Sequence, residues 1–311
     1  MFSYDTATYR TTDYGFFGPD SISWKLWTAP TALIAFQRSV VLEHFDAPLA
    51  AAVADMGGIY NDPARRLDAT LAYFVTVATA DSKTAIEASE HLMTVHAKAT
   101  GIEPISGRRY AANNPASQLW IHVTGWHSVL KCYEEYGPGP LTADEERRYW
   151  AESAIAAQLQ TCDPDQVPTS RGEVHDYFDR VRPGLCTSER AQRGMHYLLR
   201  TEGAAGNRRF WLGSRLIAPA TVATLPKWMR EIGGFDQPAL VDLAARPLTR
   251  AAVAAAANPA VAQRLIRPLA PMTAAVLAAH RASAPPADPV TVTPAQARER
   301  YGTRQRATAA R

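Results

Sequence analysis

Helix boundary signals recur along this chain, and no stretch shows the alternation of apolar and polar residues that marks a half-buried strand. Asp62 followed by Pro63 places an N-cap residue before a proline at the first helical position. The segment from Pro63 to about Ala80 then has apolar residues at helical spacing, namely Leu67, Leu71, Phe74 and Val75. This spacing predicts a helix there, and the recurrence of such segments predicts an all-α fold.

The same signals predict the next helices. One extends from about Ala116 to Tyr136, before a Gly-Pro-Gly-Pro turn. Another opens at Thr142, which is spaced to form a capping box with Glu145, and continues to about Gln160. A further helix, which carries Met195, Leu198 and Leu199, is expected after Ser188 as its N-cap.

Other boundaries follow from turn-forming residues. The segment from Ser82 to Glu87 is expected to start the next helix, with Thr84 and Glu87 spaced as a capping box. This helix is expected to end near Thr100, before Gly101, and the polar segment 107–115 predicts a loop. A short helix is expected within 168–182. From Phe210 to Arg267 we expect helices broken at prolines, which include Pro219 and Pro247.

The domain organisation is predicted from composition. A length of 311 residues alone favours about two domains, but no internal repeat or sharp shift in composition occurs before residue 280. We therefore expect one domain over residues 1–280. Residues 281–311 are Ala/Pro-rich and then basic, and are expected to form a loosely ordered tail.

Charge and cysteine content exclude several classes of protein. The net charge of +3 is too small and too scattered to indicate a nucleic-acid partner. Three cysteines without a Cys-x-x-Cys pair exclude a disulfide scaffold. The sequence shows no secretory signal and no apolar stretch long enough to span a membrane, so we expect a cytoplasmic protein with no membrane span.

Motifs for nucleotide binding, for a hydrolase nucleophile elbow and for zinc proteases are absent from the sequence. The close histidine pairs, His91 with His96 and His122 with His127, are five residues apart. On a helix the members of each pair point about 140° apart, so they do not bind one metal from the same face. If a metal is bound, single histidines favour an iron that is held mainly by a macrocycle.

Four segments in order resemble a known family. They are FGPDS at 17–21, DPARRL at 62–67 with Thr70, VHA at 95–97 followed by YAANNP at 110–115, and LWIHVT at 119–124 followed by Thr142, Glu145, Tyr149 and Glu152. Together they resemble the family of the latex clearing protein, a rubber oxygenase, and of the MpaB-type oxygenases. The resemblance spans roughly residues 13 to 240.

The resemblance implies an all-α single domain with a globin-like helical core that encloses haem b (iron protoporphyrin IX) and uses dioxygen as co-substrate. It implies an oxygenase that acts on a small apolar substrate, such as an unsaturated lipid, a terpenoid or a natural-product intermediate. It places the proximal iron ligand at His96, with His122 as the rival ligand. The distal pair falls on Arg66 and Thr70, whose i,i+4 spacing puts both on one helix face, where both can donate to negative charge that develops on dioxygen.

The sequence also departs from the family pattern. Ala69 stands where the latex clearing proteins have a lysine that binds iron from the second axial side, so the sixth position is open, holds water or takes another group. The catalytic acid is undecided among Glu43, Asp46, Asp55 and Asp62. Two other functions stay open: a haem-binding sensor, carrier or peroxidase-like protein without oxygenase chemistry, and a haem-free helical scaffold.

Overall fold

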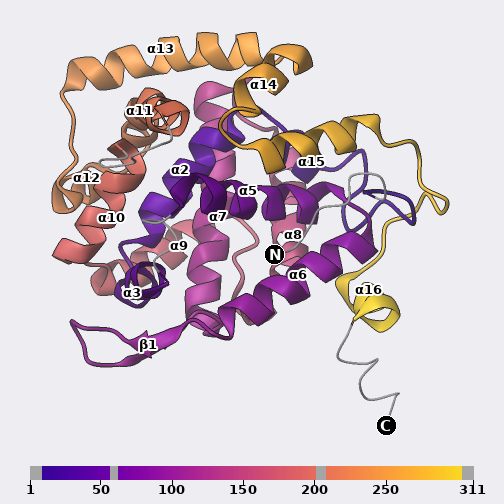
Figure 1. Cartoon of the computed structure of the whole chain (residues 1–311), viewed down its shortest axis with the longest axis horizontal. Helices are drawn as coiled ribbons and strands as arrows, with labels where there is room; N and C mark the ends of the chain where they lie inside the picture. Colours follow the sequence, from indigo (N-terminus) through magenta and orange to yellow (C-terminus); the bar gives the residue numbers. More distant parts are fainter. Residues whose placement is uncertain (1–8, 57–61, 201–207, 303–311) are drawn as a thin grey trace.

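A computed structural model describes residues 9–56, 62–200 and 208–302 of the chain (Figure 1). Its helices are α1 (Ile22–Trp27), α2 (Ala32–Glu43), α3 (Ala47–Asp55), α5 (Pro63–Thr79), α6 (Ser82–His96), α7 (Pro115–Tyr136), α8 (Ala143–Ala157), α9 (Arg171–Val181), α10 (Glu189–Arg200), α11 (Arg208–Ala223), α12 (Lys227–Gly233), α13 (Ala239–Ala256), α14 (Pro259–Ile266), α15 (Pro271–Ala282) and α16 (Pro294–Tyr301). Two short 3-10 helices cover Pro164–Gln166 and Arg182–Gly184. Strands β1 (Thr100–Ile102) and β2 (Arg109–Ala111) form an antiparallel hairpin.

Helix α7 is central, and its contacts with α2 are the most extensive between any two elements. Its buried side chains, which include Trp120, Trp126 and Leu130, belong to the largest apolar cluster of the described residues. Helices α1, α8, α9 and α11 contribute to the same cluster. The prediction of an all-α single domain is therefore confirmed. Within the described ranges, no helix is both long enough and apolar enough to cross a membrane.

Three predicted helix caps are confirmed. Ser188 accepts a hydrogen bond from the amide of Ala191 at the start of α10, and the other two caps serve α5 and α8. Asp62 accepts a hydrogen bond from the amide of Arg65 at the start of α5. At α8, Thr142 and Glu145 form the expected capping box. Because these side chains satisfy amide groups that have no partner within the helix, the sequence alone locates the three helix starts.

The expected start of α6 within 82–87 is confirmed, since the helix begins at Ser82, but its predicted cap and its predicted end are wrong. Its N-cap is Asp81, which accepts from the amide of Thr84, so Thr84 lies inside the helix and does not cap it. The helix ends at His96, and Gly101 lies in β1 opposite Tyr110. A Cβ atom on Gly101 would lie 2.6 Å from the Tyr110 hydroxyl, so this glycine permits a close approach within the hairpin and does not end a helix. The expected loop over 107–115 contains β2.

Two expected helix breaks are also absent. Pro219 lies inside α11 and Pro247 lies inside α13. A proline inside a helix removes one backbone hydrogen bond, but neighbouring helices that pack against it can hold the helix together. Here α11 and α13 pack against each other.

The segment after Ala282 differs from the expected loose tail. The backbone amide of Tyr14 donates to Val290, and the amide of Val292 donates to Gly15. Val292 and Ala297 are buried in a cluster with residues of α5 and α6. The segment up to residue 302 is thus held by the N-terminal part of the chain, which sequence patterns do not reveal. Residues 303–311 lie outside the described ranges.

One buried carboxylate joins α5 to α15. Asp68 accepts hydrogen bonds from the amides of Met272 and Thr273 and from the Thr273 hydroxyl, at 2.7 to 2.8 Å. It therefore caps the N-terminus of a helix some two hundred residues away in sequence. This contact fixes α15, which contributes Met272 to the candidate site described below.

We expect Asp68→Ala to destabilise the protein by about 2 to 4 kcal/mol, because three buried donors lose their acceptor. Urea unfolding of variant and parent measures this difference. Asp68→Asn keeps one side-chain acceptor and is the matched control, with an intermediate loss expected. An Asp68→Ala protein with the unfolding midpoint of the parent would contradict this role.

Candidate functional site

A cavity of about 370 Å³ lies among α2, α3, α5, α6 and α7. Its volume is within the range of about 300 to 1,000 Å³ that is common for small-molecule and cofactor sites. Most of its wall is apolar, with side chains such as Leu49, Val53, Phe74, Leu92 and Ile121. A few polar groups interrupt this wall, and the predicted residues His96, Arg66 and Thr70 are among them.

His96 is the last residue of α6 and lines the cavity. Its Nδ1 atom lies 3.4 Å from the side-chain nitrogen Nε2 of Gln118. Gln118 is buried, and the same Nε2 donates to the Ala112 carbonyl at 2.6 Å. Burial, reinforced by the charge of Arg66, lowers the pKa of His96 to about 4. The imidazole is therefore neutral at physiological pH, which is the form that binds metals.

Arg66 and Thr70 lie one turn apart on α5, and both line the cavity. The Arg66 guanidinium makes no hydrogen bond or ion pair with the described part of the chain, and burial lowers its pKa. The Thr70 hydroxyl donates to the Arg66 carbonyl at 2.9 Å. In this arrangement the N–H groups of the Arg66 guanidinium have no acceptor among the described residues, whereas the hydroxyl proton of Thr70 is bound to the Arg66 carbonyl.

The structure separates the four acidic candidates. Only Glu43 lines the cavity. Asp46 and Asp62 cap the starts of α3 and α5, and Asp55 accepts from Tyr110 and pairs with Arg190. These three carboxylates have structural partners away from the cavity.

Glu43 has the environment of a proton-transfer group. Burial raises its pKa to about 7, although a hydrogen bond from the Ser39 hydroxyl (2.9 Å) and the nearby charge of Arg66 oppose the shift. Carboxylates with a pKa near the working pH are effective general acids or bases. The sequence placed Glu43 among the candidates but had no means to select it, because the selection depends on burial.

His44 is a cavity residue that the sequence analysis missed. Its Nδ1 donates to the Val40 carbonyl at 2.6 Å, since a carbonyl oxygen only accepts, and Nε2 is therefore the unprotonated nitrogen. Burial lowers the pKa of His44 to about 4. A second neutral imidazole thus lines the cavity. The only sequence signal was its position directly after Glu43, at the end of a helix.

His122 lies outside the cavity wall. It is fully buried on α7, and its Nε2 atom is 3.0 Å from the Ser153 hydroxyl of α8. Burial lowers its pKa to about 4, so it too is neutral. The surroundings of His122 are those of a histidine packed between two core helices.

Tyr149 and Glu152, which belong to the fourth segment of the family resemblance, have structural roles. Glu152 accepts hydrogen bonds from the amides of Ile22 and Ser23 and so caps α1 from α8. The Tyr149 hydroxyl donates to the Trp126 carbonyl at 2.8 Å. These residues fix the packing of α1, α7 and α8 behind the cavity and do not line it.

The cavity offers individual histidines as metal ligands and, within the described ranges, no cluster of ligands. Among the described residues, no group of three or more His, Cys, Asp or Glu side chains is arranged to bind a metal ion. His91 lines the cavity with His44 and His96. An iron held only by side chains would require a cluster such as two histidines and a carboxylate, whereas a macrocycle needs one or two imidazoles.

Comparison with known families agrees with these features. The family model for the catalytic domain of the ER-bound oxygenase mpaB/B' and rubber oxygenase matches residues 24–258. The chain belongs to this family. As a member of the mpaB/rubber oxygenase family it is an oxygenase, and all the cavity residues named above except Met272 fall within the matched segment. Searches of curated proteins and of solved structures gave no match.

Proposed function

We propose that this oxygenase depends on haem b, which it binds in the cavity with His96 as the proximal iron ligand. The observation that supports the proposal is the convergence on one largely apolar cavity of a neutral His96, a buried carboxyl group at Glu43, and Arg66, which has no hydrogen-bond or ion-pair partner within the described ranges. The donor set fits the group, since single neutral imidazoles line the wall and no side-chain metal cluster is found among the described residues. When bound, haem supplies the iron that activates dioxygen.

The proposed roles of the protein groups follow from their environment. The Arg66 guanidinium, which has no partner among the described residues, stabilises negative charge as it develops on dioxygen, and the low-polarity wall strengthens this interaction. Glu43 holds or moves a proton at its carboxyl oxygen, positioned by Ser39. Thr70 bonds to the carbonyl of Arg66 and fixes that turn of α5. It contributes to dioxygen binding only if its hydroxyl rotates.

The proposed substrate is a small or medium apolar compound with a double bond. Side chains such as Leu49, Phe74, Leu92 and Ile121 bind it by excluding water, and the lining offers few polar groups to orient a polar substrate. We further propose that α2, α5, α6 and α7 form a globin-like core, and that residues 1–280 form the catalytic unit.

The absorption spectrum of protein expressed with ample haem supply tests this function. We expect a Soret band at about one haem per chain. We also expect consumption of dioxygen when unsaturated lipids or terpenoids are added. Absence of the Soret band would overturn the haem proposal. A Soret band without dioxygen uptake across such a panel would favour a sensor, carrier or peroxidase-like protein.

A further inference from the structure

Helix α13 leaves an apolar face uncovered. Leu240, Leu243 and Leu248 are exposed by 78%, 73% and 69%. At 100° per residue they lie within an arc of about 140°, and the other residues of that arc include Ala244, Pro247 and Ala251, which are also exposed. We call these six residues the α13 face. A contiguous apolar face of this kind on a protein surface marks an interaction site.

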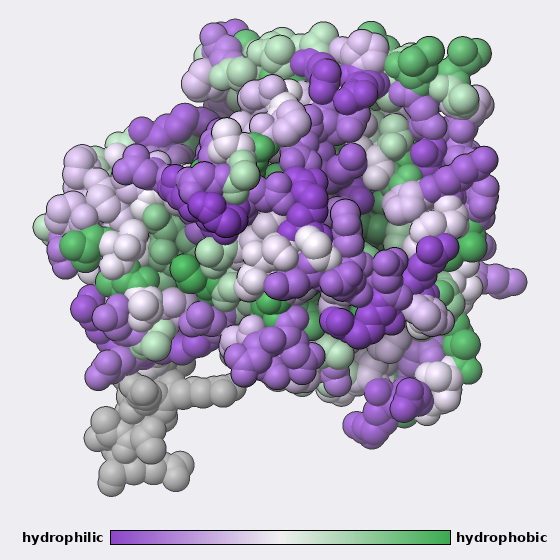
Figure 2. Space-filling model, turned by 180° about the vertical axis from the view of Figure 1, so that it is seen from behind, coloured by the Kyte–Doolittle hydropathy of each residue, from purple (hydrophilic) through white to green (hydrophobic). Residues whose placement is uncertain are grey.

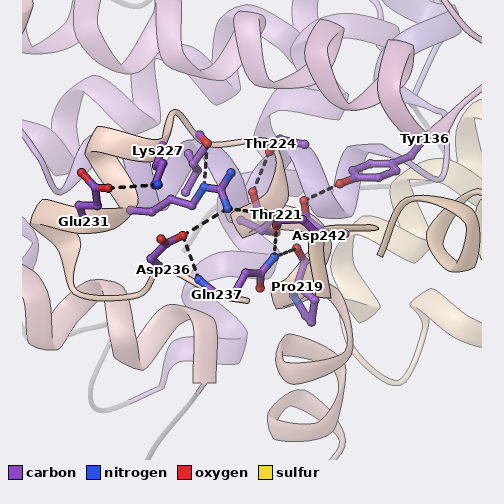
Figure 3. A network of polar contacts seen from close by, with 12 residues as sticks. Tyr136, Pro219, Thr221, Thr224, Lys227, Glu231, Asp236, Gln237 and Asp242 are labelled. Atoms are coloured by element: carbon purple, nitrogen blue, oxygen red, sulfur yellow. Dashed lines mark hydrogen bonds and ion pairs between the residues drawn. The ribbon is translucent and has the colours of Figure 1, made fainter. Parts of the chain in front are cut away.

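The orientation of α13 is fixed by its opposite side. Asp242 accepts from Arg230 (2.7 Å) and from Gln237 (2.6 Å), and Gln237 also donates to the Pro219 carbonyl of α11 (Figure 3). Farther along, Arg246 pairs with Glu135 of α7. The polar side of α13 is therefore bound to the body of the protein. Figure 1 shows α13 along the upper edge of the molecule, and Figure 2 shows hydrophobic side chains at the surface along that edge.

The surroundings of the α13 face are basic. Residues 243–287 contain five arginines and no Asp or Glu, and residues 208–230 contain four arginines, one lysine and no Asp or Glu, although the whole chain has a net charge of only +3. On α14, which packs against α13, exposed Arg264 and Arg267 flank Leu265, itself 53% exposed. Arg230 and Arg246 are paired with Asp242 and Glu135, whereas Arg264 and Arg267 have no ion pair in the part of the chain that the structure describes. Exposed leucines beside such arginines match the chemistry of an anionic lipid surface.

A protein partner fits this face less well. Stable protein interfaces are enriched in aromatic side chains at their centre, and α13 contains none. Its apolar residues are leucine, alanine, valine and proline. Leucines that insert among lipid tails, with basic residues at the level of the headgroups, are features of helices that lie in the plane of a membrane surface.

We propose that the α13 face docks this protein on an anionic lipid surface. The location is suited to the uptake of apolar molecules. Helix α11, packed beneath α13, contributes Phe210 and Ile217 to a second pocket of about 90 Å³, which shares Val40, Leu67 and Leu198 with the main cavity. Docking would place this pocket near the membrane, where apolar substrates are dissolved. That last point rests on the proposed function, whereas docking itself does not.

Sedimentation with vesicles tests the proposal. We expect the full-length protein to bind vesicles of phosphatidylcholine mixed with phosphatidylglycerol, to bind phosphatidylcholine alone more weakly, and to dissociate as salt is raised. Leu240→Gln/Leu243→Gln/Leu248→Gln should weaken binding by at least about tenfold. The matched control, Ile102→Gln/Ile105→Gln, changes two exposed residues of the hairpin segment, which are 54% and 58% exposed, and should bind like the parent.

A second variant keeps the test independent of folding defects. Arg264→Gln/Arg267→Gln removes only exposed charges and should weaken binding to anionic vesicles alone. No binding of the parent to anionic vesicles, or equal binding by the leucine variant, would overturn the proposal. Self-association that the leucine variant abolishes, without vesicle binding, would assign the face to a second copy of the chain instead. None of these readouts depends on haem, so their outcome is separate from that of the proposed function.

Discussion

His96→Ala protein, expressed with ample haem supply, is expected to show little or no Soret absorbance. The alanine removes the neutral imidazole that we propose as iron ligand at the end of α6, and the remaining imidazoles of the cavity wall, His44 and His91, lie at other positions along it. Removal of a residue that only orients a metal ligand typically lowers affinity by roughly 10- to 100-fold. The loss of haem affinity in His96→Ala should be larger, because the ligand itself is removed. The measurement is the ratio of Soret to protein absorbance after purification.

Three other histidines provide the controls. His91→Ala removes an imidazole from the same cavity wall and should leave haem binding largely intact. His122→Gln, which keeps a hydrogen-bonding group near Ser153, should retain the Soret band. Retention of haem by His96→Ala, together with its loss in His122→Gln or in His44→Ala, would show that the proximal ligand is assigned to the wrong residue.

Glu43→Gln is expected to lower the rate of substrate oxidation by about 10²- to 10⁴-fold while haem binding is kept. This range is typical for the loss of a general acid or base. Glu43 acts as a base only when its carboxyl is ionised. In the parent protein we therefore expect kcat/KM to rise with pH through about 7, as the Glu43 carboxyl ionises. The residual activity of Glu43→Gln should lack this inflection. Asp62→Asn is the matched control, since asparagine also caps helices and this residue lies off the cavity.

Glu43→Gln is also expected to change the free energy of unfolding, by an amount that depends on pH. Burial raises the pKa of Glu43 from 4.5 to about 7, so between these pH values the folded state binds more protons than the unfolded chain. Stability contributed by the protonated carboxyl is thus lost as pH rises from about 4.5 to about 7. Glutamine stays neutral, and Glu43→Gln should be about 2 kcal/mol more stable than the parent at pH 8, allowing for water in the cavity.

Unfolding by urea at pH 5 and pH 8 measures this effect. The stability gain of Glu43→Gln should be small at pH 5 and larger at pH 8. Equal differences at the two pH values would show that Glu43 does not titrate between them. A normal pH profile of kcat/KM in the variant would exclude Glu43 as the proton-transfer group.

Local sequence signals predicted most of the helices because they act within one turn. The caps at Asp62 and at Thr142 with Glu145 bind amides three residues away, so they can be predicted without knowledge of the fold. The capping residue of α6 was misread because both Asp81 and Thr84 have side chains able to cap a helix, and only the contacts of the folded chain distinguish them. Gly101 was misread for a related reason. The position requires glycine because Tyr110 lies against it across a hairpin, and this contact exists only in the folded chain.

The sequence by itself determined the all-α class, because helix boundary signals act locally, and the family, because short motifs in a fixed order are sufficient for it. It also named His96, Arg66 and Thr70 as candidate site residues. Only the tertiary structure brought these three to one cavity, added His44, and selected Glu43 among four carboxylates. The reason is physical: the chemistry of Glu43 and of the histidines depends on how far each is removed from water. That removal is produced by helices α2, α3, α5, α6 and α7 packing together, which no local pattern specifies.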